Sequence, residues 1–266
     1  MLNLLAFAPS FRHVLLVAAA PKEVEAVMAG FGHSTIPDEW RRTDVYEGWS
    51  VVRSGVGKVN GALCIGRCLA EGGELGTLVI NVGLCGALPR SDADGGMLPV
   101  GSVVVGSGSV YADEGVDAGA AGYTDMGALG FAYWQGALGD SGCSTITADA
   151  SITRAVAQQL FESGGVRVHI GTIATVSTCS GTDELALKIA QRTRAVAEAM
   201  EGAAIGHLLA RTRGAGMGFL ELRIVSNRTG DRANQQWDLK GALEMLTRVV
   251  TTLRSEPVSP QVQPTA

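Results

Sequence analysis

The sequence has few charged residues, few histidines and no pair of cysteines at metal-binding spacing. Charged side chains make up 18% of the 266 residues, and the net charge of −5 argues against a nucleic-acid-binding surface. The four histidines are widely separated, so they do not predict a metal site. The five cysteines contain no Cys-x-x-Cys motif, and their odd number favours reduced thiols in the cytoplasm over a disulfide framework.

Long apolar runs are also missing. No run approaches the roughly twenty residues of a membrane-spanning helix. The first ten residues are apolar but lack a basic segment and a clear cleavage site, so we expect neither a signal peptide nor a membrane partner. Residues 255–266 contain three prolines and no apolar periodicity, and we expect a disordered tail there.

Three widespread catalytic or nucleotide-binding motifs are absent. The Gly-rich segment Gly55–Gly61 follows an expected strand, but its third glycine comes one position too late for a dinucleotide fingerprint. The segment also lacks the spacing of a phosphate-binding loop, and no Ser or Thr follows Lys58. No Gly-x-Ser-x-Gly motif occurs anywhere. These absences disfavour a Rossmann oxidoreductase and an esterase-type hydrolase.

Short apolar segments alternate with segments of helical periodicity over residues 12–254. This alternation predicts one α/β domain of three layers, with a mixed central sheet flanked by helices. Ligands of such sheets gather at the carboxyl ends of the strands. We expect strands at 14–20, 51–52, 78–82, 102–110, 169–178, 196–200 and 219–225, and helices at 22–28, 58–69, 152–161, 184–192, 201–209 and 239–253.

The expected strand ends carry motifs that resemble those of the nucleoside phosphorylases and the methylthioadenosine/adenosylhomocysteine nucleosidases. Ala19–Val24 is similar to their opening strand and acidic turn, and Ser54–Val59 to their SGxGKV turn. Asn81–Leu88 resembles their NxGxxGxL loop, and Ala199–Ala204 the MExxA segment that grips ribose. Arg223–Asn227 stands in the place of their closing RxIS-acid motif. Each motif is weak alone, but together, in family order, they are specific.

Two further segments resemble the branch of this superfamily that hydrolyses futalosine. They are Thr175–Thr182 and Phe219–Arg232, the latter followed by Trp237. The resemblance implies a nucleoside phosphorylase-like fold and an enzyme of menaquinone biosynthesis. It implies release of hypoxanthine from futalosine, an inosine-like nucleoside with an aromatic acid at its 5′ end. It also implies a homo-oligomer, at least a dimer, in which a neighbouring subunit closes the 5′ pocket.

Two glutamates are the candidates for the chemistry at the ribose. Hydrolysis of an N-glycosidic bond passes through a cation-like ribosyl group, so the site needs an anion and a positioned water. Glu201 follows an apolar strand and could bind the ribose hydroxyls, whereas Glu23 could activate the water. Either glutamate could instead be an ordinary acid at a helix start. Glu25 is expected to be solvated.

Asn227 is the candidate for base recognition. Adenine-specific nucleosidases have Asp at this place, which can protonate the base and accept from its 6-amino group. An Asn amide can instead donate to a 6-oxo group, which fits hypoxanthine and disfavours adenine. The alternative interpretation of Asn227 is a turn-forming residue after a strand.

The resemblance also implies substrate contacts from residues around these three. Gly83 belongs to the glycine-rich loop, where many phosphorylases have an Arg for phosphate; this chain has no cation there, which favours water as the acceptor. Cys179 stands where related nucleosidases stack a Phe on the base. Met200, Ser180 and Trp237 complete the predicted substrate-binding set. We expect neither a metal nor an organic cofactor.

Other functions remain open at this stage. An adenine-type nucleosidase or a purine nucleoside phosphorylase would share most of the motifs. A non-catalytic nucleoside-binding protein on the same fold would not need both Glu23 and Glu201.

Overall fold

The computed structural model describes residues 11–72, 76–89, 96–119, 122–131, 144–212 and 216–255. Cys143 lies outside the described residues, and so does the predicted tail after Ser255. The domain boundaries 12–254 stay a prediction. The described strands are β1 (His13–Ala18), β2 (Thr43–Tyr46), β3 (Trp49–Arg53), β4 (Thr77–Ala87), β5 (Val103–Tyr111), β6 (Gly115–Asp117), β7 (Tyr123–Asp125), β8 (Thr145–Thr147), β9 (Val168–Thr175), β10 (Ala197–Ala199) and β11 (Gly218–Arg228).

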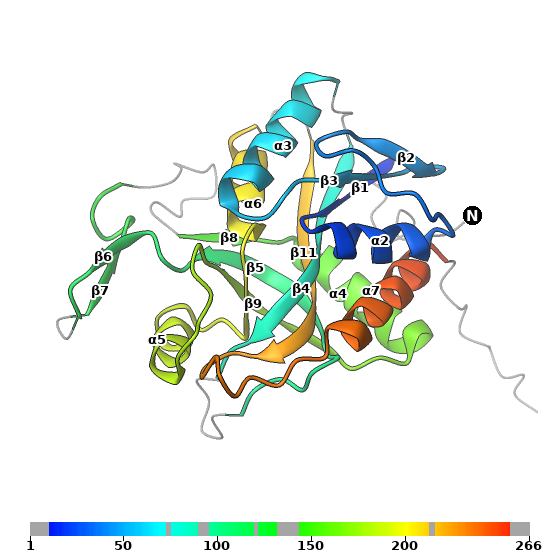
Figure 1. Ribbon diagram of the computed structural model, residues 1–266. Coiled ribbons are helices and arrows are strands. Elements are labelled where there is room, and N and C mark those ends of the chain that lie inside the picture. Colours follow the sequence, from blue (N-terminus) through cyan, green and yellow to red (C-terminus); the bar gives the residue numbers. More distant parts are fainter. Residues whose placement is uncertain are drawn as a thin grey trace, which may run out of the picture.

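The central sheet is mixed, as predicted, and runs in the order β10-β9-β5-β11-β4-β1-β3-β2, with β8 added to β5. Strand β4 is parallel to β1 and β11, whereas β11 is antiparallel to β5. Strand β10 pairs with β9 and also, antiparallel, with β4. This second pairing closes β4, β11, β5, β9 and β10 into a ring, of which Figure 1 labels β4, β11, β5 and β9. One end of the ring is therefore lined by several strands that are far apart in sequence.

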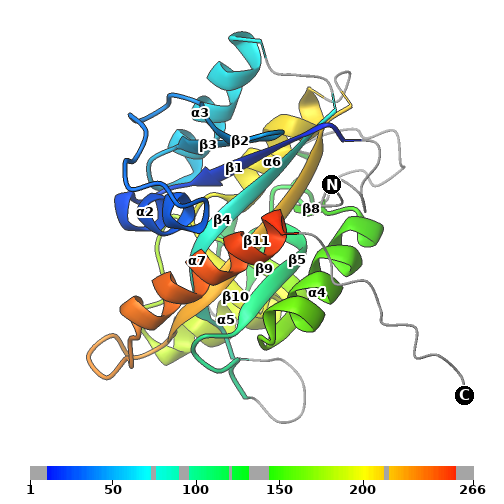
Figure 2. The same cartoon turned by 90° about the vertical axis from the view of Figure 1, so that its right-hand side faces the viewer.

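Helices cover both faces of the sheet, so the predicted three-layer α/β architecture is confirmed (Figure 2). Residues alternate along β1: Val14 and Leu16 pack in the core beneath α2, α4 and α7, whereas Leu15 and Val17 pack beneath α3 and α6. None of the helices in the described part of the chain is long and apolar enough to cross a bilayer. The helices are α2 (Pro21–Gly30), α3 (Lys58–Ala70), α4 (Ala150–Gly164), α5 (Asp183–Thr193), α6 (Gly202–Arg211) and α7 (Leu239–Arg254).

Strands β4 and β11 run well past the ends that the apolar pattern predicts. Strand β4 continues through the glycine-rich segment that we expected to be a loop, and β11 continues through Asn227. The reason is that the two strands pair with each other from Gly218 opposite Leu78 to Arg228 opposite Ala87. Each strand thus provides hydrogen-bond partners for the backbone N–H and C=O groups of the other, and this pairing does not depend on the side chains. The short strands β2, β6, β7 and β8 were not predicted.

Candidate active site

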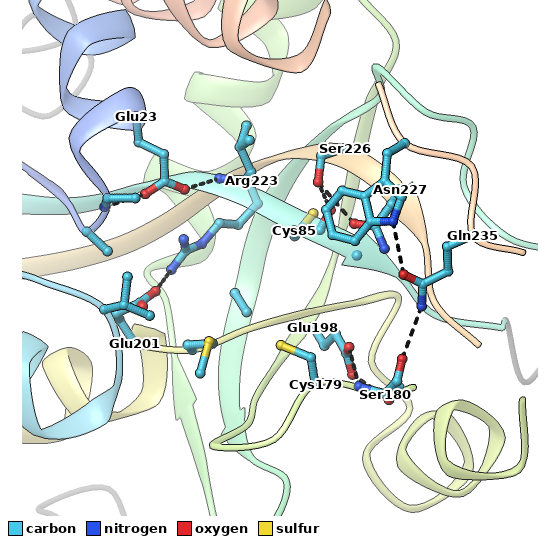
Figure 3. A pocket seen from close by; sticks show the side chains of 18 of the residues that line it. Glu23, Cys85, Cys179, Ser180, Glu198, Glu201, Arg223, Ser226, Asn227 and Gln235 are labelled. Atoms are coloured by element: carbon cyan, nitrogen blue, oxygen red, sulfur yellow. Dashed lines mark hydrogen bonds and ion pairs between the residues drawn. The ribbon is translucent and has the colours of Figure 1, made fainter. Parts of the chain in front are cut away.

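A pocket of about 540 Å³ lies at the end of the ring, in the size range of small-molecule sites (Figure 3). Its walls come from the turn between β1 and α2, from β4, from the segment after β9, from the junction of β10 and α6, and from β11 with the segment that follows it. The predicted site residues that line it are Glu23, Cys179, Ser180, Met200, Glu201, Asn227 and Trp237.

Gly83 is the predicted site residue that is not part of the pocket wall. A Cβ atom at this position would lie 2.5 Å from Oε1 of Glu23 and 2.8 Å from Nη1 of Arg223. The glycine therefore lets β4 pass close to these two charged side chains. Gly83 contributes to the site because the absence of a side chain leaves room for Glu23 and Arg223.

Glu23 lies in the first turn of α2 and is buried. Its carboxylate accepts hydrogen bonds from the backbone N–H of Ala20 (2.9 Å) and of Leu84 (2.7 Å). Burial raises the pKa of Glu23, against the opposing effect of the Arg223 charge and of these two amides. The bond to Ala20 is a helix-start interaction, but the bond to Leu84 fixes the carboxylate against β4. Glu25, in contrast, is exposed and pairs with Lys22.

Glu201 has the N-cap position of α6, yet its side chain makes no capping hydrogen bond. Instead, Oε1 accepts from the backbone N–H of Gly57 (2.9 Å) and Oε2 accepts from Nη2 of Arg223 (2.9 Å). Gly57 can aim its amide this way because it has a φ of 99°, which disfavours any other residue. The side chain of Glu201 therefore does not cap α6, and Gly57 and Arg223 hold its carboxylate instead.

Arg223 lies between the carboxyl groups of Glu23, Glu201 and Glu221. Its side chain is buried, and Nε donates to Oε1 of Glu221 at 2.9 Å. Burial lowers the pKa of Arg223, but the charges of Glu221, Glu201 and Glu23 outweigh this and raise the pKa above its usual value. One cation thus lies among three carboxyl groups, and burial raises the pKa of two of them, Glu23 and Glu221.

The motifs in the sequence include Arg223 without assigning it a role, and they do not point to Glu221. A signal was present, however. The two charges lie two positions apart within an apolar segment, so they share one face of a strand that the pattern predicts to be buried.

Asn227 lies at the opposite end of the pocket from Glu23 and Glu201 (Figure 3). It is buried inside β11, next to an irregularity in the pairing with β4. Its Oδ1 accepts from the hydroxyl of Ser226 (3.0 Å), and its Nδ2 donates to the carbonyl of Arg228 (3.1 Å). The interpretation of Asn227 as a turn residue is wrong, because the strand continues past it.

Glu198 is a pocket residue that the sequence analysis missed. It lies in β10, is 4% exposed, and accepts from both the backbone N–H (2.8 Å) and the hydroxyl (2.6 Å) of Ser180. Burial raises the pKa of its carboxyl group, and the two bonds from Ser180 lower it. The signal was a charged residue in the middle of the apolar strand 196–200.

The segment after β11 folds back over the pocket. The backbone N–H of Asp238 donates to the carbonyl of Ser226, which holds Trp237 next to Asn227. The indole Nε1 of Trp237 donates to Oε1 of Gln235 (3.1 Å), and Nε2 of Gln235 donates to the carbonyl of Ser180 (3.3 Å). Gln235 and Arg232, which also line the pocket, were not predicted.

Cys179 lies at the pocket surface beside Ser180. Desolvation is the main cause of a raised pKa for its thiol, so the reactive thiolate is disfavoured and a nucleophilic role is not supported. The described cysteines are free thiols, and in the described parts of the chain no three potential ligand residues come together as a metal site would require.

Comparisons with known proteins identify the family. The family model described as the phosphorylase superfamily matches residues 14–255. A curated futalosine hydrolase from Acidothermus cellulolyticus is 31% identical over 241 residues, which cover 90% of this chain and 89% of that protein. The chain belongs to the futalosine hydrolase branch of the phosphorylase superfamily. A second member of the branch, from Thermus thermophilus, is 34% identical over 79% of this chain and 82% of its own length.

The superfamily fold is also found among solved structures. A methylthioadenosine/adenosylhomocysteine nucleosidase from Neisseria meningitidis, in complex with methylthio-immucillin-A, superimposes with a TM-score of 0.69. The match covers 91% of this chain and 98% of the nucleosidase, at 21% identity. The likeness shows a shared fold, on which the side chains define the activity.

Proposed function

We propose that this nucleosidase hydrolyses the N-glycosidic bond of futalosine and releases hypoxanthine and dehypoxanthinyl futalosine, as a step of menaquinone biosynthesis. The observation that carries the proposal is a single pocket with Glu23 and Glu201 at one end and Asn227 at the other, in a chain that is 31% identical to a curated futalosine hydrolase. The acidic end receives the ribose, and the amide end receives the base.

The acidic end provides what a ribosyl cation needs. Oε1 and Oε2 of Glu201 each accept one hydrogen bond from the protein, which leaves lone pairs for the ribose hydroxyls. The carboxylate of Glu201, which lines the pocket beside Arg223, stabilises positive charge that develops on the ribose. Glu23, held by two backbone amides, accepts the proton of the attacking water.

The charges around the pocket favour water over phosphate as the acceptor. Of the described residues that line the pocket, the basic ones are Arg223 and Arg232. Arg223 already faces three carboxylates, and Arg232 stacks 4.9 Å above the ring of Trp237. A phosphate at this end of the pocket would meet the carboxylate of Glu201, and both basic side chains of the described lining already have partners. Turnover of futalosine in phosphate-free buffer, at a rate that added phosphate does not raise, is the result that tests this point.

Asn227→Asp should move base preference from hypoxanthine toward adenine. The amide of Asn227 can donate to a 6-oxo group, whereas an Asp accepts from a 6-amino group. A buried donor left unpaired costs about 1–3 kcal/mol, or about a ten- to hundredfold change in specificity. The measurement is the ratio of kcat/KM for futalosine and its 6-amino analogue in both proteins. An unchanged ratio would show that Asn227 does not read the base.

We also propose that the enzyme acts as a homodimer in the cytoplasm. Val56, Val59 and Leu63, on the turn before α3 and on α3 itself, are exposed by 49%, 70% and 54%, and Val56 also lines the pocket. An apolar surface at the pocket mouth fits a second copy that closes the 5′ side of the site. The free thiol of Cys179 fits a reducing compartment.

Val59→Asp should therefore convert dimer to monomer and raise the KM for futalosine, because a buried unpaired charge opposes association. Light scattering coupled to gel filtration measures the mass. The control is Leu187→Asp on α5, where the leucine is also exposed (44%) but does not belong to this surface. A wild-type protein that is monomeric at micromolar concentration would contradict the proposal.

A further inference from the structure

We propose that the carboxylate of Glu198 accepts a hydrogen bond from N1–H of the 6-oxopurine, and that it selects this base against adenine together with Asn227. The inference deepens the proposed function, on which it rests for the identity of the base. It starts from a buried carboxylate that lines the pocket and that the chemistry at the ribose does not use.

The sheet places Glu198 and Asn227 on two sides of the same residue. In the pairing of β10 with β4, Glu198 is opposite Gly86, and in the pairing of β11 with β4, Asn227 is opposite Gly86. Neighbouring strands lie about 4.8 Å apart, so the two backbones are roughly 10 Å from each other. This separation suits a flat base that receives hydrogen bonds at two edges.

Gly86 keeps the space between them open. A Cβ atom there would lie 2.7 Å from Cγ2 of Thr229 and 3.4 Å from Nδ2 of Asn227. Figure 3 shows Glu198, Cys179 and Asn227 around the same end of the pocket, away from Glu23 and Glu201. The base end therefore has a glycine floor, with a carboxylate on one side and an amide on the other.

Glu198 is held in place and retains capacity to bind. Ser180 donates its backbone N–H to Oε1 and its hydroxyl to Oε2. A carboxylate has about four lone-pair sites, so each oxygen can accept one more hydrogen bond. Two donors from a single residue fix the orientation of the carboxylate, which then presents acceptors to the pocket.

The chemistry of the two purines differs at the atom that Glu198 would reach. N1 of a 6-oxopurine carries a hydrogen and donates, whereas N1 of adenine has a lone pair and accepts. The carboxylate, whose two oxygens both act as acceptors toward Ser180, therefore bonds the first and repels the second at a buried position. Asn227 reads the 6-substituent, and Glu198 reads the adjacent ring position, so adenine would be mismatched at both.

The test is calorimetric binding of free bases, which does not depend on turnover. In the wild-type protein, hypoxanthine should bind about ten- to a hundredfold more tightly than 1-methylhypoxanthine and than adenine. In Glu198→Gln, the amide can keep its carbonyl toward the N–H of Ser180 and donate to N1 of adenine. The ratio of the two dissociation constants should thus shift toward adenine by about ten- to a hundredfold. Glu244→Gln, at an exposed glutamate of α7, should leave the ratio unchanged.

Each outcome decides the point. If Glu198→Gln weakens both bases equally, or if the wild-type protein binds 1-methylhypoxanthine as tightly as hypoxanthine, Glu198 only supports Ser180 and the inference fails. The second measurement needs no variant and so holds even if Glu198→Gln does not fold. Release of hypoxanthine from futalosine is measured separately: its absence would overturn the proposed function while leaving the base-binding result interpretable.

Discussion

Glu201→Gln should nearly abolish turnover without unfolding the protein. The substitution preserves shape but removes the negative charge that faces the ribosyl cation, an effect of about 2–4 kcal/mol, or roughly 30- to 1,000-fold in kcat. Because Oε1 and Oε2 accept from Gly57 and Arg223, the amide nitrogen of Gln must face one of these donors. We therefore also expect a lower melting temperature, with Arg223 still bound to Glu221.

The matched control is Glu25→Gln, which removes an exposed carboxylate paired only with Lys22 on the same helix. Its kcat and melting temperature should match those of the wild type, since exposed pairs of this kind contribute about 0–1 kcal/mol. Equal activity of the Glu201 and Glu25 variants would mean that Glu201 does not contact the ribose. Loss of activity in parallel with loss of the folded state would indicate a structural role.

Glu23→Gln should lower kcat by about 100- to 10,000-fold, the usual contribution of a general base. The amide also conflicts with the N–H groups of Ala20 and Leu84, which both donate to this side chain. A reaction that needs Glu23 to accept a proton requires its ionised form. Since burial raises the pKa of Glu23, activity should fall as the pH is lowered through a pKa above the usual range of a glutamate.

The pH profile of kcat/KM separates this role from a structural one. In the wild type, the acidic limb should lie at the raised pKa of Glu23, and in Glu23→Gln the residual activity should lack that limb. An acidic limb at the same position in both proteins would assign the titration to another group and contradict the role of Glu23 as the base.

The helices and the longer strands could be predicted from the sequence, because the apolar pattern of each one lies within a single segment of the chain. The apolar run that ends at Pro21 predicts β1 and the start of α2, and both are present. Glu23, Glu201 and Asn227 were found through motifs at strand ends, and the fold brings all three to one pocket. Their chemical roles stay predictions.

The features of the site that could not be predicted from the sequence depend on pairing between distant segments. Glu198 belongs to the base end only because β10 crosses to pair with β4, and no local periodicity encodes that contact. Likewise, a turn at Asn227 stayed open as the alternative interpretation, because neither segment alone reveals the ladder between β4 and β11 that extends the strand. Gln235 reaches Ser180 across 55 positions, through a turn that has no regular pattern.

The ring closure of the sheet also has a consequence for how the enzyme is made. Strand β4 pairs with β10 and β11, and the hydroxyl of Ser226 bonds the carbonyl of Cys85 across 141 positions of the chain. Contacts at such separation are slow to form, because the loop between them must close before any pairing repays the lost entropy. During synthesis, β4 leaves the ribosome after its partner β1 but long before its partners β10 and β11. In the nascent chain, the edge of β4 that pairs with β11 therefore stays without its partner, and a catalytic pocket exists only after almost the whole chain has been released and folded.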